Sequence, residues 1–112
     1  MTYNKNRTVV FVETKLFTEL VKEYLSDDEY GKLQQYIMEN PEVGKIIRGS
    51  GGVRKARWSR KGMGKSGGVR TIYYWAKARD EIYMLTMYSK SEKENIDKQT
   101  LAQIAKQLEG IK

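Results

Sequence analysis

The hydrophobic pattern of the first forty residues predicts a short strand followed by two helices. Residues 7–12 (RTVVFV) are mostly β-branched or aromatic, which is typical of a strand. Apolar residues then recur at the spacing of one helical face, at Leu16, Phe17, Leu20, Val21, Tyr24 and Leu25. Ser26 and Glu29 have the S-x-x-E spacing of a capping box, so we expect a second helix from there to Asn40 and Pro41. Its apolar positions are Tyr30, Leu33 and Ile37, with Tyr36 as a further candidate.

The pattern beyond Pro41 changes to three β-rich segments and one further helix. Strands are predicted at about 53–59, at 69–76 (VRTIYYWA) and at 81–88 (EIYMLTMY). A glycine cluster separates the first two and is too long for a two-residue hairpin turn, at Gly62, Gly64, Gly67 and Gly68. A third helix is marked by Leu101, Ile104, Ala105 and Leu108, with Asp97 as its cap and Gly110 at its end.

These elements follow one another in the order β-α-α-β-β-β-α. The order predicts an α+β fold, in which an antiparallel sheet packs against an N-terminal helical hairpin and a C-terminal helix. The last three strands most simply form a meander. At 112 residues, without repeats or an obvious linker, we expect residues 1–112 to form a single domain.

Charge is concentrated in one third of the chain. Residues 43–79 contain eleven Lys and Arg and no Asp or Glu, whereas the other 75 residues have a net charge of −4. The same segment holds eight of the ten glycines and both tryptophans. A charge run is usually a solvated face, but self-repulsion without interleaved acid disfavours that interpretation here. We therefore expect a partner that presents phosphates.

Composition excludes several kinds of site. The chain has no Cys, so it can form neither disulfides nor thiolate metal sites. It has no His either, which removes the commonest acid–base catalyst and metal ligand. No apolar run approaches the roughly 20 residues of a membrane span, and the N-terminus lacks a signal-peptide core. A cytoplasmic protein without membrane contacts is expected.

Strand alternation predicts where the basic side chains point. Lys55 and Arg57 share one face of their strand, while Ala56 and Trp58 face the core. Arg70 opens the next strand, about 4.8 Å away, and can converge on the same surface. The intervening glycine-rich loop allows backbone N–H groups to approach a phosphate, and its basic residues are Arg60, Lys61 and Lys65.

This basic surface leaves one route to RNA cleavage open. Metal-dependent nucleases cluster carboxylates, and the basic region has none. RNA supplies its own nucleophile, the 2′-hydroxyl, and Arg suits the stabilisation of the charged phosphorane. Proton transfer would require neighbouring cations to lower the pKa of a Tyr or Lys from about 10. Tyr88 and Lys90 are the candidates, although an ordinary half-buried strand tyrosine is the alternative for Tyr88.

Several motifs together resemble the HigB-type branch of the RelE/ParE superfamily of toxins. The most specific are residues 51–57 (GGVRKAR) and 61–74 (KGMGKSGGVRTIYY). The segments 85–92 (LTMYSKSE), 11–14 (FVET) and 24–30 (YLSDDEY) are similar to the same family. The resemblance covers essentially the whole chain, and the predicted order of elements is the family's order.

The resemblance implies a type II toxin, an mRNA interferase that cleaves mRNA in the ribosomal A site without metal or other cofactor. Arg70 matches the arginine that stabilises the scissile phosphate, and Lys55 and Arg57 match the paired basic residues of the preceding strand. Lys90 matches the basic residue after the last strand, and Tyr88 a proton-handling position that varies in the family. RNA contacts are expected from Arg54, Arg60, Lys61 and Lys65.

The implied partners are mRNA on the small ribosomal subunit and a cognate helix-turn-helix antitoxin of the HigA type. The antitoxin either covers the basic face or binds elsewhere and blocks entry to the A site. Because the chain lacks His, cleavage away from the ribosome should be slow, and the ribosome would supply the orientation of the RNA.

Two other functions compete with the endoribonuclease. A non-catalytic RNA- or ribosome-binding domain would retain the salt-sensitive affinity of the basic face without the chemistry. A DNA-binding regulator would need a basic recognition helix, whereas the predicted helices contain most of the acidic residues. We therefore expect no specific DNA binding by the chain itself.

Overall fold

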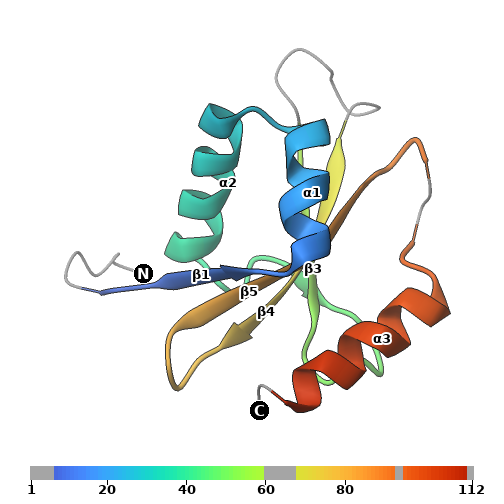
Figure 1. Cartoon of the computed structure of the whole chain (residues 1–112). Helices are drawn as coiled ribbons and strands as arrows, with labels where there is room; N and C mark the ends of the chain where they lie inside the picture. Colours follow the sequence, from blue (N-terminus) through green and yellow to red (C-terminus); the bar gives the residue numbers. More distant parts are fainter. Residues whose placement is uncertain (1–6, 60–67, 93–94, 111–112) are drawn as a thin grey trace.

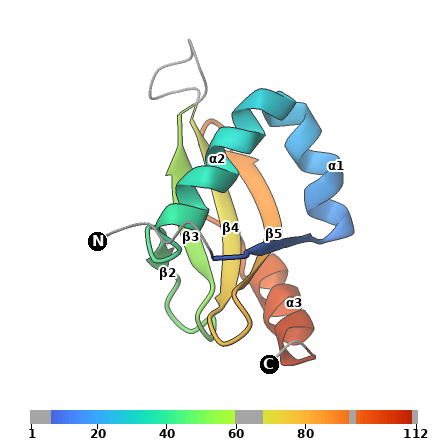
Figure 2. The same cartoon turned by 90° about the vertical axis from the view of Figure 1, so that its left-hand side faces the viewer.

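The computed structural model describes residues 7–59, 68–92 and 95–110. A five-stranded sheet with the order β1-β5-β4-β3-β2 forms its centre. Helices α1 and α2 lie over one face of the sheet and α3 over the other (Figures 1 and 2). In chain order the elements are β1 (Val10–Glu13), α1 (Lys15–Tyr24), α2 (Asp27–Glu39), β2 (Lys45–Ile46), β3 (Arg54–Trp58), β4 (Val69–Ala76), β5 (Glu81–Ser89) and α3 (Lys98–Glu109).

The predicted α+β class is confirmed, with two differences in the sheet. β1 pairs with β5 in parallel, so the sheet is mixed rather than antiparallel. The prediction considered only hairpin connections, whereas β1 reaches β5 through the long crossover formed by the rest of the chain. The second difference is β2, which pairs with the start of β3 and is too short to give a periodic signal.

Each described helix begins at a side-chain cap. Ser26 accepts a hydrogen bond from the backbone N–H of Glu29 (3.1 Å) and so starts α2, as predicted. Asp97 caps α3 by accepting from Thr100 N–H (2.7 Å), also as predicted. Thr14 does the same for α1, which the sequence pattern had not indicated. None of the described helices is both long and apolar enough to cross a membrane.

The core consists of two clusters on opposite faces of the sheet. The larger one joins α1 and α2 to β4 and β5, with Phe17, Leu33 and Tyr73 at its centre. The smaller one packs α3 against the other face through Ile104 and Leu108. Residues Ile72 to Trp75 of β4 belong alternately to the two clusters, as expected for a strand covered on both faces.

Candidate functional site

Three predicted site residues form one row across the sheet. Arg57 of β3 lies directly opposite Arg70 of β4, and Arg70 lies directly opposite Tyr88 of β5. Residues opposite each other in antiparallel strands point to the same face, which here is the α3 face. The other face of β3 behaves as predicted, because Ala56 is buried and Trp58 packs against the α1–α2 cluster.

An open pocket of about 390 Å³ lies at the end of this row. We call it the basic pocket, and it is lined by Arg57, Trp58, Ser59, Gly68, Arg70 and Lys90. Lys90 reaches it from the end of β5, where its backbone N–H donates to the carbonyl of Gly68 (3.2 Å). The fold thus brings together three of the basic residues that the sequence singled out, from three different strands or strand ends.

The positive charge of the basic pocket is not neutralised within the described part of the chain. There, Arg57, Arg70 and Lys90 form no ion pair, whereas Arg7, Lys32 and Arg79 each pair with an Asp or Glu elsewhere. Like charges directly opposite each other in a sheet are destabilising. Arg70 is only 8% exposed, and burying a charge without a partner is costly. An anionic ligand would reduce both the repulsion between Arg57 and Arg70 and the cost of burying the charge of Arg70.

Tyr88 lies beside Arg70 but is 4% exposed and packs in the α3 cluster. Burial raises the pKa of its hydroxyl above the ordinary value, and the charge of Arg70 and a hydrogen bond with the Ile96 backbone offset only part of the rise. Arg70 thus lowers this pKa, as proton transfer by Tyr88 would require, but burial outweighs the effect of the charge. Near neutral pH the hydroxyl is protonated, so it can donate a hydrogen bond but is a poor base.

Lys55 and Arg54 have different surroundings, because they point to opposite faces of β3. Lys55 shares the α3 face with Arg57, and its Nζ donates to Oδ1 of Asn95 (3.3 Å). Arg54 points to the other face, donates to the backbone carbonyls of Glu42 and Gly44 (3.2 and 2.8 Å) and pairs with the Glu42 carboxylate. This geometry makes Arg54 a structural anchor and does not favour its predicted RNA contact.

The remaining predicted RNA contacts, Arg60, Lys61 and Lys65, lie outside the described residues. Across the described ranges, no group of three or more acidic side chains is arranged to hold a metal ion.

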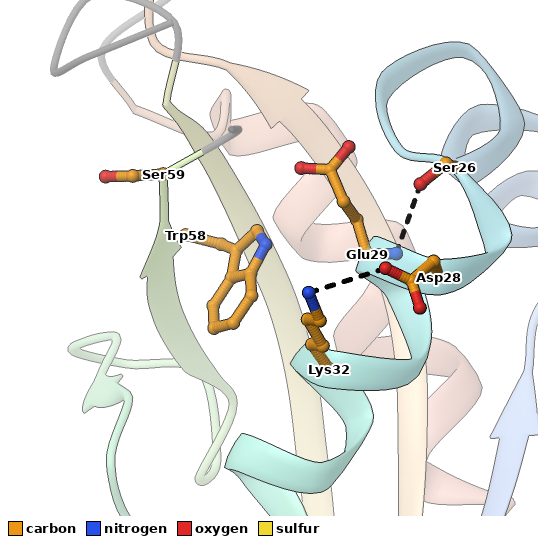
Figure 3. A pocket seen from close by; sticks show the side chains of 6 residues that line it. All are labelled: Ser26, Asp28, Glu29, Lys32, Trp58 and Ser59. Atoms are coloured by element: carbon orange, nitrogen blue, oxygen red, sulfur yellow. Dashed lines mark hydrogen bonds and ion pairs between the residues drawn. The ribbon is translucent and has the colours of Figure 1, made fainter. Parts of the chain in front are cut away.

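A second pocket, of about 360 Å³, is lined by Trp58 and Ser59 together with residues of α2 and its cap (Figure 3). Its remaining lining comes mainly from the start of α2, where Lys32 pairs with Asp28 (3.4 Å) and Glu29 lies beside them. Trp58 and Ser59 line both this pocket, which we call the acidic pocket, and the basic pocket. Asp28, Glu29 and Lys32 give this lining a net charge of −1, so it is less favourable for a phosphate than the Arg70 side. The sequence did not reveal this pocket, because the acidic residues were interpreted only as part of the helix start.

Comparison with known proteins gives a family match and a fold match. The family model described as the RelE toxin of the RelE/RelB toxin–antitoxin system matches residues 9–111. The structure is similar to a free double mutant of E. coli toxin RelE, with a TM-score of 0.56 and 14% identity over 91% of this chain and 99% of that one. It is also similar to a chain of the intact E. coli RelBE toxin–antitoxin complex, with a TM-score of 0.55 and 13% identity over 73% and 96%.

Proposed function

The chain belongs to the family of RelE toxins of RelE/RelB toxin–antitoxin systems, and from this premise we propose that it is a ribosome-dependent endoribonuclease. It cleaves mRNA in the ribosomal A site and so inhibits translation. The observation that supports this most is the opposed pair Arg57 and Arg70, unneutralised by any described acid, in the basic pocket.

The proposed chemistry needs only the RNA and these side chains. The 2′-oxygen loses its proton and forms a bond to the adjacent phosphorus, while the bond from phosphorus to the 5′-oxygen breaks and that oxygen gains a proton. Negative charge accumulates on the non-bridging oxygens, where the planar guanidinium of Arg70 can donate two hydrogen bonds. Arg57 contacts the same phosphate from the opposite strand, and Lys90 faces it from the exposed rim.

Tyr88 has a supporting role in this proposal. It does not line the basic pocket, and its pKa is raised by burial, so we assign it to holding Arg70 in place rather than to removing the 2′-proton. Lys55, beyond Arg57 on the same face, contacts the neighbouring phosphate.

The proposal includes a cognate antitoxin, as the family name implies. We place the chain in the HigB-type branch because of its glycine- and lysine-rich motif, and we expect a helix-turn-helix antitoxin of the HigA type and a cytoplasmic location, where the ribosomes are. A short helix-turn-helix reading frame next to the gene would support this assignment.

Inducing the chain in a growing culture and mapping RNA 5′ ends tests the activity. We expect new ends inside translated transcripts and none in the same transcripts when their start codon is removed. Arg70→Ala should abolish both the cleavage and the growth arrest, with a loss of about 10²–10³-fold in rate. Arg79→Ala is the matched control, because Arg79 pairs with Glu81 away from the basic pocket. Growth arrest without new 5′ ends would instead indicate the non-catalytic RNA-binding domain.

A further inference from the structure

A third pocket, of about 320 Å³, opens where β3 runs past the end of the short strand β2. We call it the edge pocket, and it is lined by Tyr36, Val43, Lys45, Lys55, Ala56 and Arg57. Arg57 lines both the edge pocket and the basic pocket. The edge pocket lies where β3 extends beyond its pairing with β2, so Lys55 and Arg57 reach it from the α3 face and Tyr36 from the α2 face. A single extended ligand that passes Arg57 can contact both pockets.

The edge pocket, like the basic pocket, is lined by basic side chains that have no acidic partner among the described residues. Lys45 lies directly opposite Lys55 in the register of β2 and β3, so their side chains share one face. Neither lysine forms an ion pair with any residue that the structure describes. The acid of the adjoining segment, Glu42, pairs with Arg54 (3.5 Å). The charges of Lys45 and Lys55 are thus not compensated by any described acid, and the Lys55 Nζ donates only to the neutral Asn95 Oδ1 (3.3 Å) among the hydrogen bonds that the described residues show.

Tyr36 contributes an aromatic side chain to the lining of the edge pocket, beside the two lysines. The ring is 41% exposed, and its centroid lies 5.6 Å from that of Trp58 at an interplanar angle of 46°. The contact with Trp58 supports one side of the ring. The exposed remainder offers a π-face on which a base of any sequence can stack.

The segment that closes the edge pocket is held in place before any ligand arrives. The hydroxyl of Tyr73 donates to the carbonyl of Pro41 (2.7 Å) and accepts from the N–H of Gly44 (3.0 Å). Arg54 donates to the Gly44 carbonyl from the same strand that forms the pocket floor. A wall fixed in this way loses little conformational entropy on binding.

We propose that the edge pocket is a second nucleotide subsite for single-stranded RNA. A base stacks on Tyr36, its phosphate is held between Lys45 and Lys55, and the next phosphate along the strand passes to Arg57 and the basic pocket. The inference rests on the proposed RNA substrate and extends it to two residues, Tyr36 and Lys45, that the cleavage chemistry does not use. Acidic side chains of a protein partner would match the lysines but not the stacking face.

The test measures binding of a fluorescent 2′-O-methyl RNA hexanucleotide, which lacks the nucleophile and cannot be cleaved, to the full chain over a range of salt concentrations. Lys45→Gln should weaken binding and lower the slope of log affinity against log salt by about 0.7. Tyr36→Ala should weaken binding about tenfold at all salt concentrations, and Tyr36→Phe should restore it. Lys106→Gln, an equal change of charge on an exposed position of α3, is the control for net charge. Thermal unfolding of each variant shows that it is folded.

The proposal is overturned if Lys45→Gln changes the salt slope no more than Lys106→Gln does, or if folded Tyr36→Ala binds like the unaltered chain. It is also overturned if the two variants lose affinity for poly-glutamate and not for RNA, which would indicate an acidic protein partner. Because the hexanucleotide cannot react, a chain that binds it at the edge pocket but cuts no mRNA would contradict only the proposed enzyme. A chain that cuts mRNA but is indifferent to both substitutions would contradict only the subsite.

Discussion

Single residues of the site differ in how burial and charge combine. Arg70 is buried and charged, with no ion pair to any described residue, whereas Tyr88 beside it is buried and neutral. The sequence analysis predicted that both belong to one site, because each lies on a predicted strand within or close to the basic segment 43–79. It could not show that Tyr88 packs under α3, since that depends on residues about twenty positions later in the chain.

Substitution of Tyr88 separates a supporting role from proton transfer. Tyr88→Phe keeps the ring that packs in the α3 cluster, so we expect cleavage to remain within about tenfold of the unaltered rate, whereas loss of a general base would cost about 10²–10⁴-fold. The free energy of unfolding should change by no more than about 1 kcal/mol, because the ring and its packing in the α3 cluster are kept. Single-turnover cleavage on programmed ribosomes and urea unfolding measure the two quantities. A thousandfold slower Tyr88→Phe variant would show that the hydroxyl takes part in the chemistry.

At the scale of elements, the parts of the fold with a local cause could be predicted. Ser26 and Asp97 act within one helical turn, and β4 was predicted with its observed bounds from its β-branched and aromatic residues. The parallel pairing of β1 with β5 depends on how the whole chain closes, so no local pattern indicated it. The short strand β2 was missed in the same way, and with it the position of Lys45.

Two glycines on either side of the α2 terminus should respond oppositely to alanine. A Cβ on Gly44 would lie 2.9 Å from Cε1 of Tyr73 and 3.0 Å from the backbone carbonyl carbon of Lys55. We expect Gly44→Ala to lower the free energy of unfolding by about 1–3 kcal/mol, because the tightly packed segment must move. Gly31→Ala, in α2 with no atom within 4 Å of the new Cβ, should raise it by about 0.5–1 kcal/mol.

Urea unfolding at one pH measures both glycine variants. Equal effects of the same sign would contradict the close packing of Gly44 against Tyr73.

At the scale of the whole molecule, alkaline pH should destabilise the fold through its tyrosines. Burial and a hydrogen bond with Glu92 raise the pKa of Tyr24 to about 12, and burial also raises the pKa values of Tyr30, Tyr73 and Tyr88. A group whose pKa is higher in the folded state stabilises fully below its unfolded pKa, about 10 for Tyr, and loses that contribution as the pH rises through the folded value. The free energy of unfolding should therefore decline above about pH 10.

Urea unfolding at half-unit steps from pH 8 to pH 12 measures the decline. Tyr30→Phe should make it shallower, because the hydroxyl of Tyr30 is buried against the carboxylate of Glu13. A curve that stays level to pH 12 would contradict the raised pKa values.

At the acid end, Arg7 lowers the pKa of Asp80, so the contribution of that pair should be lost only as the pH falls below about 4.

The tertiary structure explains why some residues of the site could be predicted from the sequence and others could not. Arg57 and Arg70 were found because alternation and strand order suffice to put them on one face. Tyr36 was interpreted as part of the apolar face of α2, and only the tertiary structure shows that its ring is exposed beside Trp58. Arg54 was grouped with the basic run, although its guanidinium holds the segment after α2.

The position of Trp58 gives the molecule an optical reporter of its own. Its indole borders the basic and acidic pockets and touches Tyr36, whereas Trp75, the other tryptophan, lies toward the opposite end of β4 and donates to Asp80 (3.0 Å). Replacing Trp75 by Phe would leave Trp58 as the one tryptophan, and its fluorescence should respond to a ligand in either of the two pockets that it lines. Ligand occupancy could then be followed in real time without attaching a dye.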